Sequence, residues 1–438
     1  MSQSLIPRWR RVYAAEGSVV APDERLSATQ TIAMGVQHVV AMFGATVLAP
    51  LLMGFDANVA ILMSGVGTLI FFLFVRGRVP SYLGSSFAFI GGVIAATGYA
   101  GAGANANIGV ALGAIIVCGL VYALIGAVVW YFSSRPGGGT AWIEALMPPV
   151  VTGAVVAVIG LHLAPIAARG AVGGGGFDAF MAVVTMLCVG GVAVYTRGMT
   201  QRLLILVGLI LACVIYYILA NGLGWGTPMD LSAVGAAAWL GAPQFTRPEF
   251  HLEAMGLIVP VVVILVAENL GHIKAVAAMT GRDLDGYLGR AFVGDGVATM
   301  VSGAVGGTGM TTYAENIGVM SVTRIYSTLV FVVAGVIAIL LGFSPKFGAL
   351  IHAIPGPVLG GVSVVVFGLI TVAGARIWIQ NRVDFTDNRN LIVVAITMIF
   401  GAGDFTLTFG SFVLNGIGTA TFGAIILYWL LNRRRDAY

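Results

Sequence analysis

Glu268 and His272 stand four residues apart inside an otherwise apolar run that extends from Ala254 to Val276. On a helix, residues with this spacing share one face. The run is long enough to cross a bilayer, which takes about 20 residues, so the carboxyl group and the imidazole are expected at membrane depth. A charge at the centre of a spanning helix costs roughly 2.5–3.5 kcal/mol, and such residues usually face a cavity, a partner or a transported species. Glu268 is therefore predicted to belong to a functional site.

A second acid, Glu315, lies in a stretch from Gly309 to Gly318 that reads GMTTYAENIG. Threonine and tyrosine favour an extended backbone before the acid. A half-helix beginning near Asn316 would then offer free N–H groups and the positive end of its dipole to a ligand. The stretch from Leu83 to Phe89 could do the same from the first half of the chain. Two such segments beside two acids suit a small, planar, uncharged ligand with alternating N–H and C=O groups.

The composition defines the class of protein that must position these groups. Of 438 residues, 58% are hydrophobic and 9% are charged, whereas soluble domains carry about 25% charged residues. The chain is therefore predicted to be an all-α polytopic membrane protein in contact with membrane lipid. In such a protein the net charge of +4 reports topology, and we expect no nucleic acid partner.

The sequence gives little support for an enzyme or for a passive channel. Cys118, Cys188 and Cys213 lie in apolar runs without metal-ligand spacing, so we expect no metal site. Glu268 and His272 alone supply neither a nucleophile with its base nor a metal-binding motif, and we expect no catalytic residues and no cofactor. A passive channel would need a continuous polar lining, whereas the polar residues of this chain cluster at one depth.

Hydropathy predicts 14 transmembrane segments between a tail of residues 1–29 and a tail of residues 432–438. A polar segment, 223–253, separates two groups of seven. The predicted bounds are 30–53, 57–75, 81–98, 107–132, 145–167, 178–195, 203–222, 254–276, 290–305, 311–324, 326–343, 355–374, 390–403 and 411–431.

The distribution of basic residues orients these spans. Of the 22 Lys and Arg residues, all but Arg169, Arg247 and Lys346 fall on the side of the termini. By the positive-inside rule both termini are predicted to be cytoplasmic, in a multi-pass protein of a bacterial inner membrane. Segment 223–253 is then periplasmic.

Spans 3 and 10 are both short and interrupted by glycines, and they stand seven apart. Such paired broken segments point to the binding site of a transporter built from inverted repeats. Because seven is odd, the second half must cross the membrane in the opposite sense to the first, which predicts 7+7 inverted repeats. The same offset pairs span 8, with Glu268 and His272, to span 1, with Gln37 and His38.

Four stretches of the chain resemble motifs of the nucleobase–ascorbate transporter family. The likeness covers about residues 21–424, and is closest to the bacterial uracil permeases and to the RutG-type pyrimidine permease branch. The stretches are Gln37-His38 followed by Ala41-Met42-Phe43-Gly44-Ala45-Thr46, Tyr82-Leu83-Gly84-Ser85-Ser86-Phe87-Ala88-Phe89, Glu268-Asn269-Leu270-Gly271-His272, and Thr311-Thr312-Tyr313-Ala314-Glu315-Asn316-Ile317-Gly318 running to Thr323-Arg324.

The resemblance implies a core domain, 30–132 and 254–343, and a gate domain, 145–222 and 355–431. The core holds spans 1–4 and 8–11, and the gate holds spans 5–7 and 12–14. Spans 3 and 10 are expected to contain short strands, and the nucleobase to lie between core and gate. A homodimer is also implied.

The resemblance also implies roles for single residues. Glu268 is expected to pair with a pyrimidine ring and Glu315 to be a second acid at the base, while Phe87 and Ala314 contact it through their backbones. His272 is expected to reach the base or a bridging water. The remaining implied residues are Ala45 and Tyr313 in the substrate site, His38 bracing Asn316, and Gln37, Gly318, Thr323 and Arg324 in support of the motif.

Proton coupling also follows from the residues themselves. A carboxyl group shielded from water favours its neutral form, so a Glu268 that binds the base best while protonated binds proton and base together by linkage. The predicted function is import of uracil, and of other pyrimidine bases, by proton symport through Glu268 and His272. The alternative is a xanthine or broader nucleobase carrier, because Ala314 replaces a glycine of the uracil permeases beside the ligand.

Structural roles remain open for several residues. Glu315 could cap the half-helix at its N-terminus, and His272 could brace a neighbouring segment. Asp295 is expected at the cytoplasmic interface rather than in the site.

Overall fold

The computed structural model describes residues 7–13, 18–99, 103–133, 141–409 and 412–432. Within these residues the chain is mainly helical, with three two-stranded sheets. The first half contains β1 (Arg10–Arg11), β2 (Glu24–Arg25), α1 (Ala28–Met53), α2 (Ala57–Phe74), β3 (Leu83–Ser85), α3 (Phe89–Thr97), α4 (Ile108–Ser133), α5 (Ala141–Leu146), α6 (Pro149–Val172), α7 (Gly176–Tyr195), α8 (Met199–Arg202), α9 (Leu204–Tyr217) and the π-helix η1 (Ile218–Gly222). The second half contains α10 (Ser232–Ala236), α11 (Leu252–Ile258), α12 (Val261–Thr280), α13 (Asp285–Val305), β4 (Met310–Thr312), α14 (Ala314–Thr323), α15 (Thr328–Gly342), α16 (Pro345–His352), α17 (Gly356–Gln380), α18 (Asn388–Ala402), β5 (Leu407–Phe409), β6 (Phe412–Leu414) and α19 (Gly416–Asn432).

Eight helical segments of the described chain are long and apolar enough to cross a membrane. They correspond to α1, α2, α4, α6, α7, α9 with η1, α11 with α12, and α17. A ninth candidate is the pair α15 and α16, which is bent by 81°. Helices α18 and α19 are apolar but shorter. The chain is thus a multi-pass membrane protein, with helices at the positions that hydropathy predicts.

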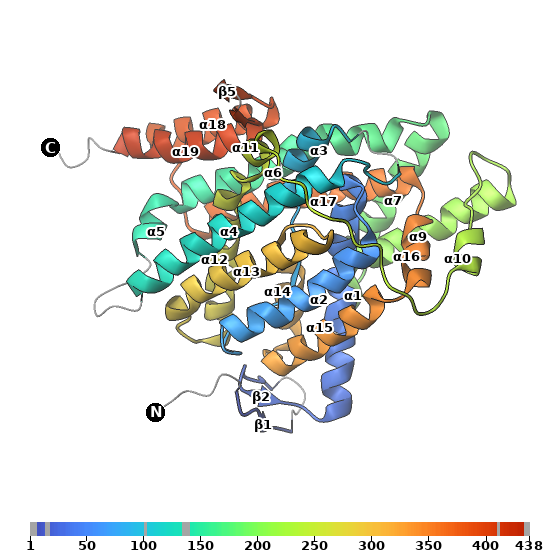
Figure 1. Ribbon diagram of the computed structural model, residues 1–438, viewed down its shortest axis with the longest axis horizontal. Coiled ribbons are helices and arrows are strands. Elements are labelled where there is room, and N and C mark those ends of the chain that lie inside the picture. Colours follow the sequence, from blue (N-terminus) through green and yellow to red (C-terminus); the bar gives the residue numbers. More distant parts are fainter. Residues whose placement is uncertain (1–6, 14–17, 100–102, 134–140, 410–411, 433–438) are drawn as a thin grey trace.

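Two groups of helices pack closely through glycines. In the first group α13 packs along α4 and α15 packs along α2, and a Cβ on Gly119 would lie 2.7 Å from the carbonyl oxygen of Gly296. In the second group α17 packs along α6, and a Cβ on Gly374 would lie 2.4 Å from the carbonyl oxygen of Gly153. Small residues permit this close approach of membrane helices. Figure 1 shows α18 and α19 along α6, at the edge of the molecule opposite β1 and β2.

The two spans predicted to be broken are broken in the structure. β3 leads into α3 and β4 leads into α14, and the two strands pair antiparallel, with Gly84 opposite Thr311. The expected short strands of spans 3 and 10 are therefore confirmed. Each strand and the half-helix after it run in place of one continuous spanning helix.

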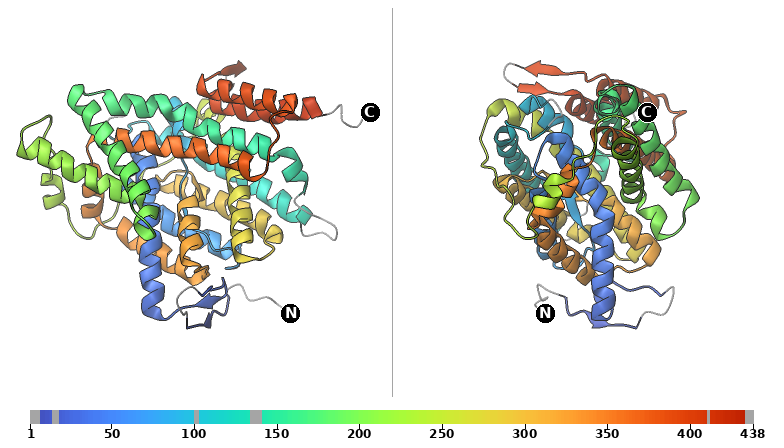
Figure 2. Two further views of the ribbon diagram at one scale, coloured as in Figure 1. Left: turned by 180° about the vertical axis from the view of Figure 1, so that it is seen from behind. Right: turned by 90° about the vertical axis from the view of Figure 1, so that its right-hand side faces the viewer.

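Residues of the predicted N-terminal tail pack against the first group of helices. The backbone of Val20 bonds to the carbonyl oxygen of Arg324 and to the amide of Tyr326. Asp23 forms an ion pair with Arg282, in the turn between α12 and α13. Figure 2 shows β1 and β2 beside the N-terminal end of α1. The predicted C-terminal tail lies outside the described residues beyond Asn432.

The segment predicted to separate the halves runs across the ends of several helices. Its backbone bonds through Gly241, Thr246 and Glu249 to the carbonyl oxygens of Phe343, Val305 and Gly109. Figure 1 shows α10, in this segment, and α5 at opposite ends of the bundle. From α10 the segment leads to α11, near the upper edge of the molecule in the same view.

Candidate functional site

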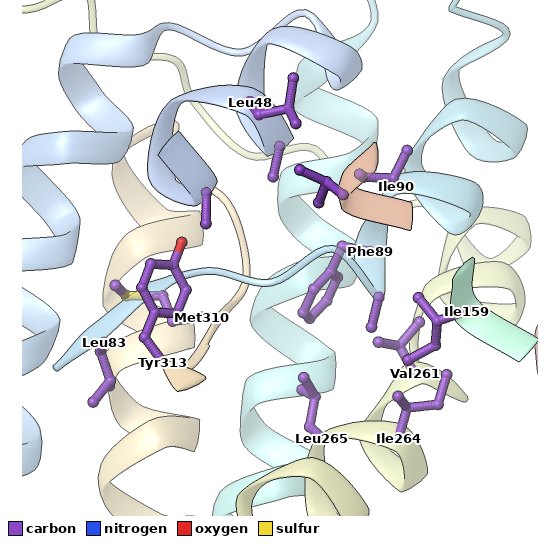
Figure 3. Close-up of a cluster of buried hydrophobic side chains, with 14 of the residues drawn as sticks. Leu48, Leu83, Phe89, Ile90, Ile159, Val261, Ile264, Leu265, Met310 and Tyr313 are labelled. Atoms are coloured by element: carbon purple, nitrogen blue, oxygen red, sulfur yellow. The ribbon is translucent and has the colours of Figure 1, made fainter. Parts of the chain in front are cut away.

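Threonine hydroxyl groups hold the buried strand pair in place. Thr68 of α2 accepts a hydrogen bond of 2.9 Å from the amide of Leu83, and Thr299 of α13 accepts one of 3.1 Å from the amide of Met310. These amides lie on the outer edges of β3 and β4. Inside a membrane an unpaired backbone group costs several kcal/mol, so these hydroxyl groups make the short sheet possible. Figure 3 shows Leu83 and Met310 near Tyr313 among the buried side chains around the strands.

A cavity of about 750 Å³ opens beside the strand pair. One wall comes from β3, α12, β4 and α14, and the other comes from α6, α7, α8, α9 and α17. Its polar and charged lining residues are Ser85, Gln201, Glu268, His272, Thr311, Thr312, Tyr313, Glu315, Arg376 and Gln380. A crevice of about 800 Å³ near α1, α9 and α16 is lined almost wholly by apolar side chains, so it lacks the groups that would orient a polar ligand.

Helix α12 turns its acid and its histidine toward β4. The hydroxyl group of Thr311 donates to a carboxyl oxygen of Glu268 at 3.2 Å. Nδ1 of His272 lies 2.8 Å from the hydroxyl oxygen of Thr312. The four-residue spacing therefore places both side chains on one helix face, as predicted, against consecutive strand residues. The bracing contact of His272 is present, and its ring also lines the cavity.

The start of α14 contributes the second acid. Ala314 and Glu315 are the first two residues of this helix, two positions earlier than the predicted start at Asn316. Both line the cavity together with Gly318. The side chain of Tyr313, the residue before α14, makes no capping hydrogen bond, and the N-terminus of a helix directs its first N–H groups outward, where they can donate to a ligand.

Phe87 lines the cavity from the segment between β3 and α3. Its ring packs edge-on against Phe367 of α17, with the ring centroids 6.1 Å apart. Phe87 thus contacts both walls of the cavity.

Several residues predicted for the site lie outside the cavity and support it. The side-chain amide of Asn316 contacts Nδ1 of His38 and donates to its carbonyl oxygen, both at 3.0 Å, which is the expected bracing contact. Gln37 reaches the sulfur of Met199 at 2.8 Å. Ala45 is fully buried in α1.

Tyr313 lines the cavity, but its hydroxyl group bonds within the fold. It donates to the carbonyl oxygen of Ser85 at 3.0 Å and accepts from Thr46 at 3.1 Å. These bonds tie the end of β4 to β3 and to α1.

Thr323 and Arg324 lie at the opposite end of α14 from Glu315. Thr323 bonds back to the carbonyl oxygen of Val319 at 3.0 Å. Arg324 ends the helix in a left-handed conformation with φ of 54° and is exposed. Both terminate the half-helix and do not touch the cavity.

The expectation that Asp295 is interfacial is wrong. Asp295 is fully buried, ten residues into α13, and accepts a hydrogen bond of 2.5 Å from the side chain of Asn269. The helix begins at Asp285, five residues before the predicted span, which moves Asp295 to mid-helix. The hydroxyl group of Tyr122 lies 3.0 Å from the same amide nitrogen.

Sequence analysis missed the wall of the cavity formed by α17. This helix continues to Gln380, six residues beyond the predicted end of span 12, and carries Arg376 into the lining. Arg376 had counted only as a loop residue in the charge distribution. Ala373, Arg376 and Gln380 are spaced by three and four residues, which places them on one helix face. This spacing could have indicated that the helix continues to Gln380.

The described residues include no group of three or more His, Cys, Asp and Glu side chains arranged to hold a metal ion.

Comparison with known proteins identifies the family. A family model described as "Permease family" matches residues 29–410. The chain is 66% identical to RutG of Escherichia coli strain K12, designated a candidate pyrimidine permease, over 98% of this chain and 96% of that protein. It is 40% identical to the uracil permease of Bacillus caldolyticus, over 94% and 95% of the two chains.

The fold is shared with more distant transporters. The murine Solute Carrier 26 family member A9 anion transporter, solved in its inward-facing state, superposes with a TM-score of 0.67 at 10% identity. The match covers 96% of this chain and 76% of that one. From the family model and the relatives together, the chain belongs to this permease family, the nucleobase–ascorbate transporters whose motifs it carries.

Proposed function

We propose that the protein is a secondary active transporter that imports uracil, with the proton as its coupling ion. The observation that carries the proposal is a cavity bounded by Glu268 and Glu315 where the two broken spans pair. The names of the relatives, uracil permease and pyrimidine permease, support the same substrate class.

The chemistry of the wall suits a pyrimidine ring. Carboxyl oxygens of Glu268 and Glu315 accept hydrogen bonds from ring N–H groups. Backbone N–H groups at Phe87 and Ala314, near the starts of α3 and α14, donate to ring carbonyl oxygens. A ring with alternating donors and acceptors satisfies both sets, and a ligand that lacks them leaves buried polar groups unpaired.

Glu268 and His272 carry the proposed proton coupling. A protonated Glu268 accepts a hydrogen bond from a ring N–H group through its carbonyl oxygen. It carries no charge, and a buried charge would be costly. Binding of the proton and binding of the base therefore strengthen each other reciprocally. Thr311, which donates to Glu268 at 3.2 Å, fixes the position of the carboxyl group in both protonation states.

Fourteen spans in 7+7 inverted repeats, divided into core and gate, account for the helix packing. If each span of the first half corresponds to the span seven places later, α4 corresponds to α15 and α2 to α13, so the contact of α4 with α13 has its counterpart in the contact of α15 with α2. In the same way α7 corresponds to α18 and α9 to α19, and both the pair α7 and α9 and the pair α18 and α19 are in contact. The same shift relates Thr68 and Thr299, which bond the two strands. Alternating access then arises from movement of the core against the gate.

We further propose that the protein works as a homodimer in the bacterial inner membrane, surrounded by lipid, with both termini cytoplasmic. The asymmetry of Lys and Arg between the two ends supports this orientation. Exposed apolar side chains on α7, α9 and α19 suit contact with lipid or a second copy.

The alternative is a xanthine or broader nucleobase carrier. The volume of the cavity, about 750 Å³, favours it, because cavities of this size accept ligands larger than one six-membered ring.

The test is uptake of labelled uracil into proteoliposomes with and without an inward proton gradient, with unlabelled thymine and xanthine as competitors. The proposal expects concentrative, gradient-driven uptake that xanthine does not block. Equilibration at one rate regardless of the gradient would indicate a facilitator, and strong competition by xanthine would indicate the broader carrier.

A further inference from the structure

The wall formed by α17 changes character along the helix. Its cavity-lining residues are Val366, Leu369, Ile370, Ala373, Arg376, Ile377 and Gln380. Their spacing by three and four residues places them on one helix face. The face is apolar up to Ala373, and then presents a guanidinium group and, one turn later, an amide.

Arg376 is the single cation among the described residues that line this cavity. Its side chain is exposed, lines the cavity and has no ion pair with any residue in the described part of the chain. The two acids of the lining, Glu268 and Glu315, are on the opposite wall and already serve the proposed ring site. A guanidinium group offers a planar set of donors that matches a carboxylate or a phosphate.

The cavity has room for more than a pyrimidine ring. Its volume, about 750 Å³, is within the range of about 300–1,000 Å³ that holds drug-sized ligands. A ring against the strand pair leaves space along α17. An anionic substituent on that ring would be repelled by the two acids and attracted by Arg376, which fixes its orientation.

We propose that Arg376 forms an anion subsite, through which the cavity binds pyrimidines that carry a carboxylate or phosphate group. The ring lies toward Glu268 and Glu315, and the anionic group toward Arg376. Gln380, one turn away on the same face, offers a further donor. This inference rests on the proposed nucleobase site and extends it to a second class of ligand.

The test compares a charged and a neutral ligand of equal size on the purified full-length protein. Orotate, which is uracil-6-carboxylate, and its neutral amide are each used to displace labelled uracil. The variants are Arg376→Gln, Arg376→Lys and the control Arg382→Gln, because Arg382 is exposed just beyond α17 and does not line the cavity.

The expected result is a change in the ratio of the two affinities. Arg376→Gln should weaken orotate relative to the amide by about five- to tenfold, as for a charge-assisted hydrogen bond at a water-accessible position. Arg376→Lys should restore part of that ratio, and Arg382→Gln should leave it at the wild-type value. Uridine 5′-monophosphate against uridine repeats the comparison for phosphate and identifies which anion the subsite prefers.

The inference is overturned if orotate does not displace uracil from the wild-type protein, or if Arg376→Gln weakens orotate and the amide equally. Both outcomes require that labelled uracil binds. Absence of uracil binding to the folded wild-type protein would instead refute the proposed function, so the two failures are distinguishable.

Discussion

Glu268 combines substrate contact and proton binding in one side chain under the proposed mechanism. Glu268→Gln keeps the size and the hydrogen-bonding capacity of the side chain but cannot exchange a proton. Coupling between two ligands typically amounts to about 1–3 kcal/mol, so we expect gradient-stimulated uracil uptake to fall about tenfold. Uptake in proteoliposomes at matched inner and outer pH, and with a gradient, measures the loss.

The matched control for this variant is Glu253→Gln, at the exposed start of α11, which should transport as the wild type does. Full gradient-driven accumulation by Glu268→Gln would show that the coupling proton binds elsewhere.

Gly84 permits the close contact between the strand pair and Tyr313. A Cβ added at Gly84 would lie 2.4 Å from the tyrosine ring, and the hydroxyl group of that ring is held by Ser85 and Thr46. Gly84→Ala should therefore destabilise the protein by roughly 1–3 kcal/mol, the usual cost of overpacking, and weaken uracil binding. Thermal unfolding and equilibrium binding of uracil measure both effects.

Gly190→Ala is the control for Gly84→Ala, because a Cβ there would meet no atom within 4 Å. It should leave the Tm and the uracil affinity unchanged. If Gly84→Ala behaves in the same way, the strand pair does not depend on this contact.

At the scale of elements, the N-terminal segment is fastened to the end of α14 that lies away from the cavity. Val20 bonds on both sides of Ile325, and the indole of Trp9 donates to Thr328 at 3.0 Å. Because the opposite end of α14, at Ala314 and Glu315, lines the cavity, the N-terminal segment holds in place a helix of the site. We expect its acidic residues to influence the stability of the protein.

Two carboxyl groups of this segment give the contact a defined pH dependence. Burial would raise the pKa of Asp23, but the hydrogen bond and charge of Arg282 lower it; the hydrogen bond from Arg10 lowers the pKa of Glu24. A carboxyl group with a lowered pKa stabilises the fold above its unfolded value, about 4, and this contribution disappears as pH falls through the folded pKa. The Tm should therefore decrease below about pH 4 more in the wild type than in Asp23→Asn.

The difference in Tm between the wild type and Asp23→Asn at pH 7 should be small, about 1–3 °C, because Asp23 and Arg282 are partly exposed and screened by salt. A double-mutant cycle with Asp23→Asn and Arg282→Gln isolates the pair. Additive changes in Tm would show that the ion pair contributes nothing.

For the whole molecule, the sequence predicted those features of the fold that depend on local spacing and composition. The pairing of broken spans 3 and 10, the shared face of Glu268 and His272 and the contact of His38 with Asn316 all appear in the structure. The resemblance to the family supplied the strand pair and the contact of His38 with Asn316, because no local pattern joins residues more than 200 positions apart in the chain. The lengths of the apolar runs also located the helices that carry these groups.

The features that could not be predicted depend on where helices end and on distant packing. Hydropathy ends a span at its first charge, so the extension of α17 to Arg376 and Gln380 was missed. Asp295 was misplaced for the same reason at the start of α13. The docking of residues 18–26 near α15 joins segments some 300 residues apart and leaves no trace in local composition.

The position of the cavity relative to the two membrane faces gives the last prediction. Gln380 lines the cavity at the C-terminal end of α17, on the face that the basic residues assign to the cytoplasm. Leu240 is 79% exposed in the segment at the other face. In a background with Cys118, Cys188 and Cys213 replaced by alanine, a membrane-impermeant maleimide should label Leu240→Cys in right-side-out vesicles. It should label Gln380→Cys only in inside-out vesicles. The opposite pattern, with Gln380→Cys labelled in right-side-out vesicles and Leu240→Cys labelled only in inside-out vesicles, would reverse the proposed orientation.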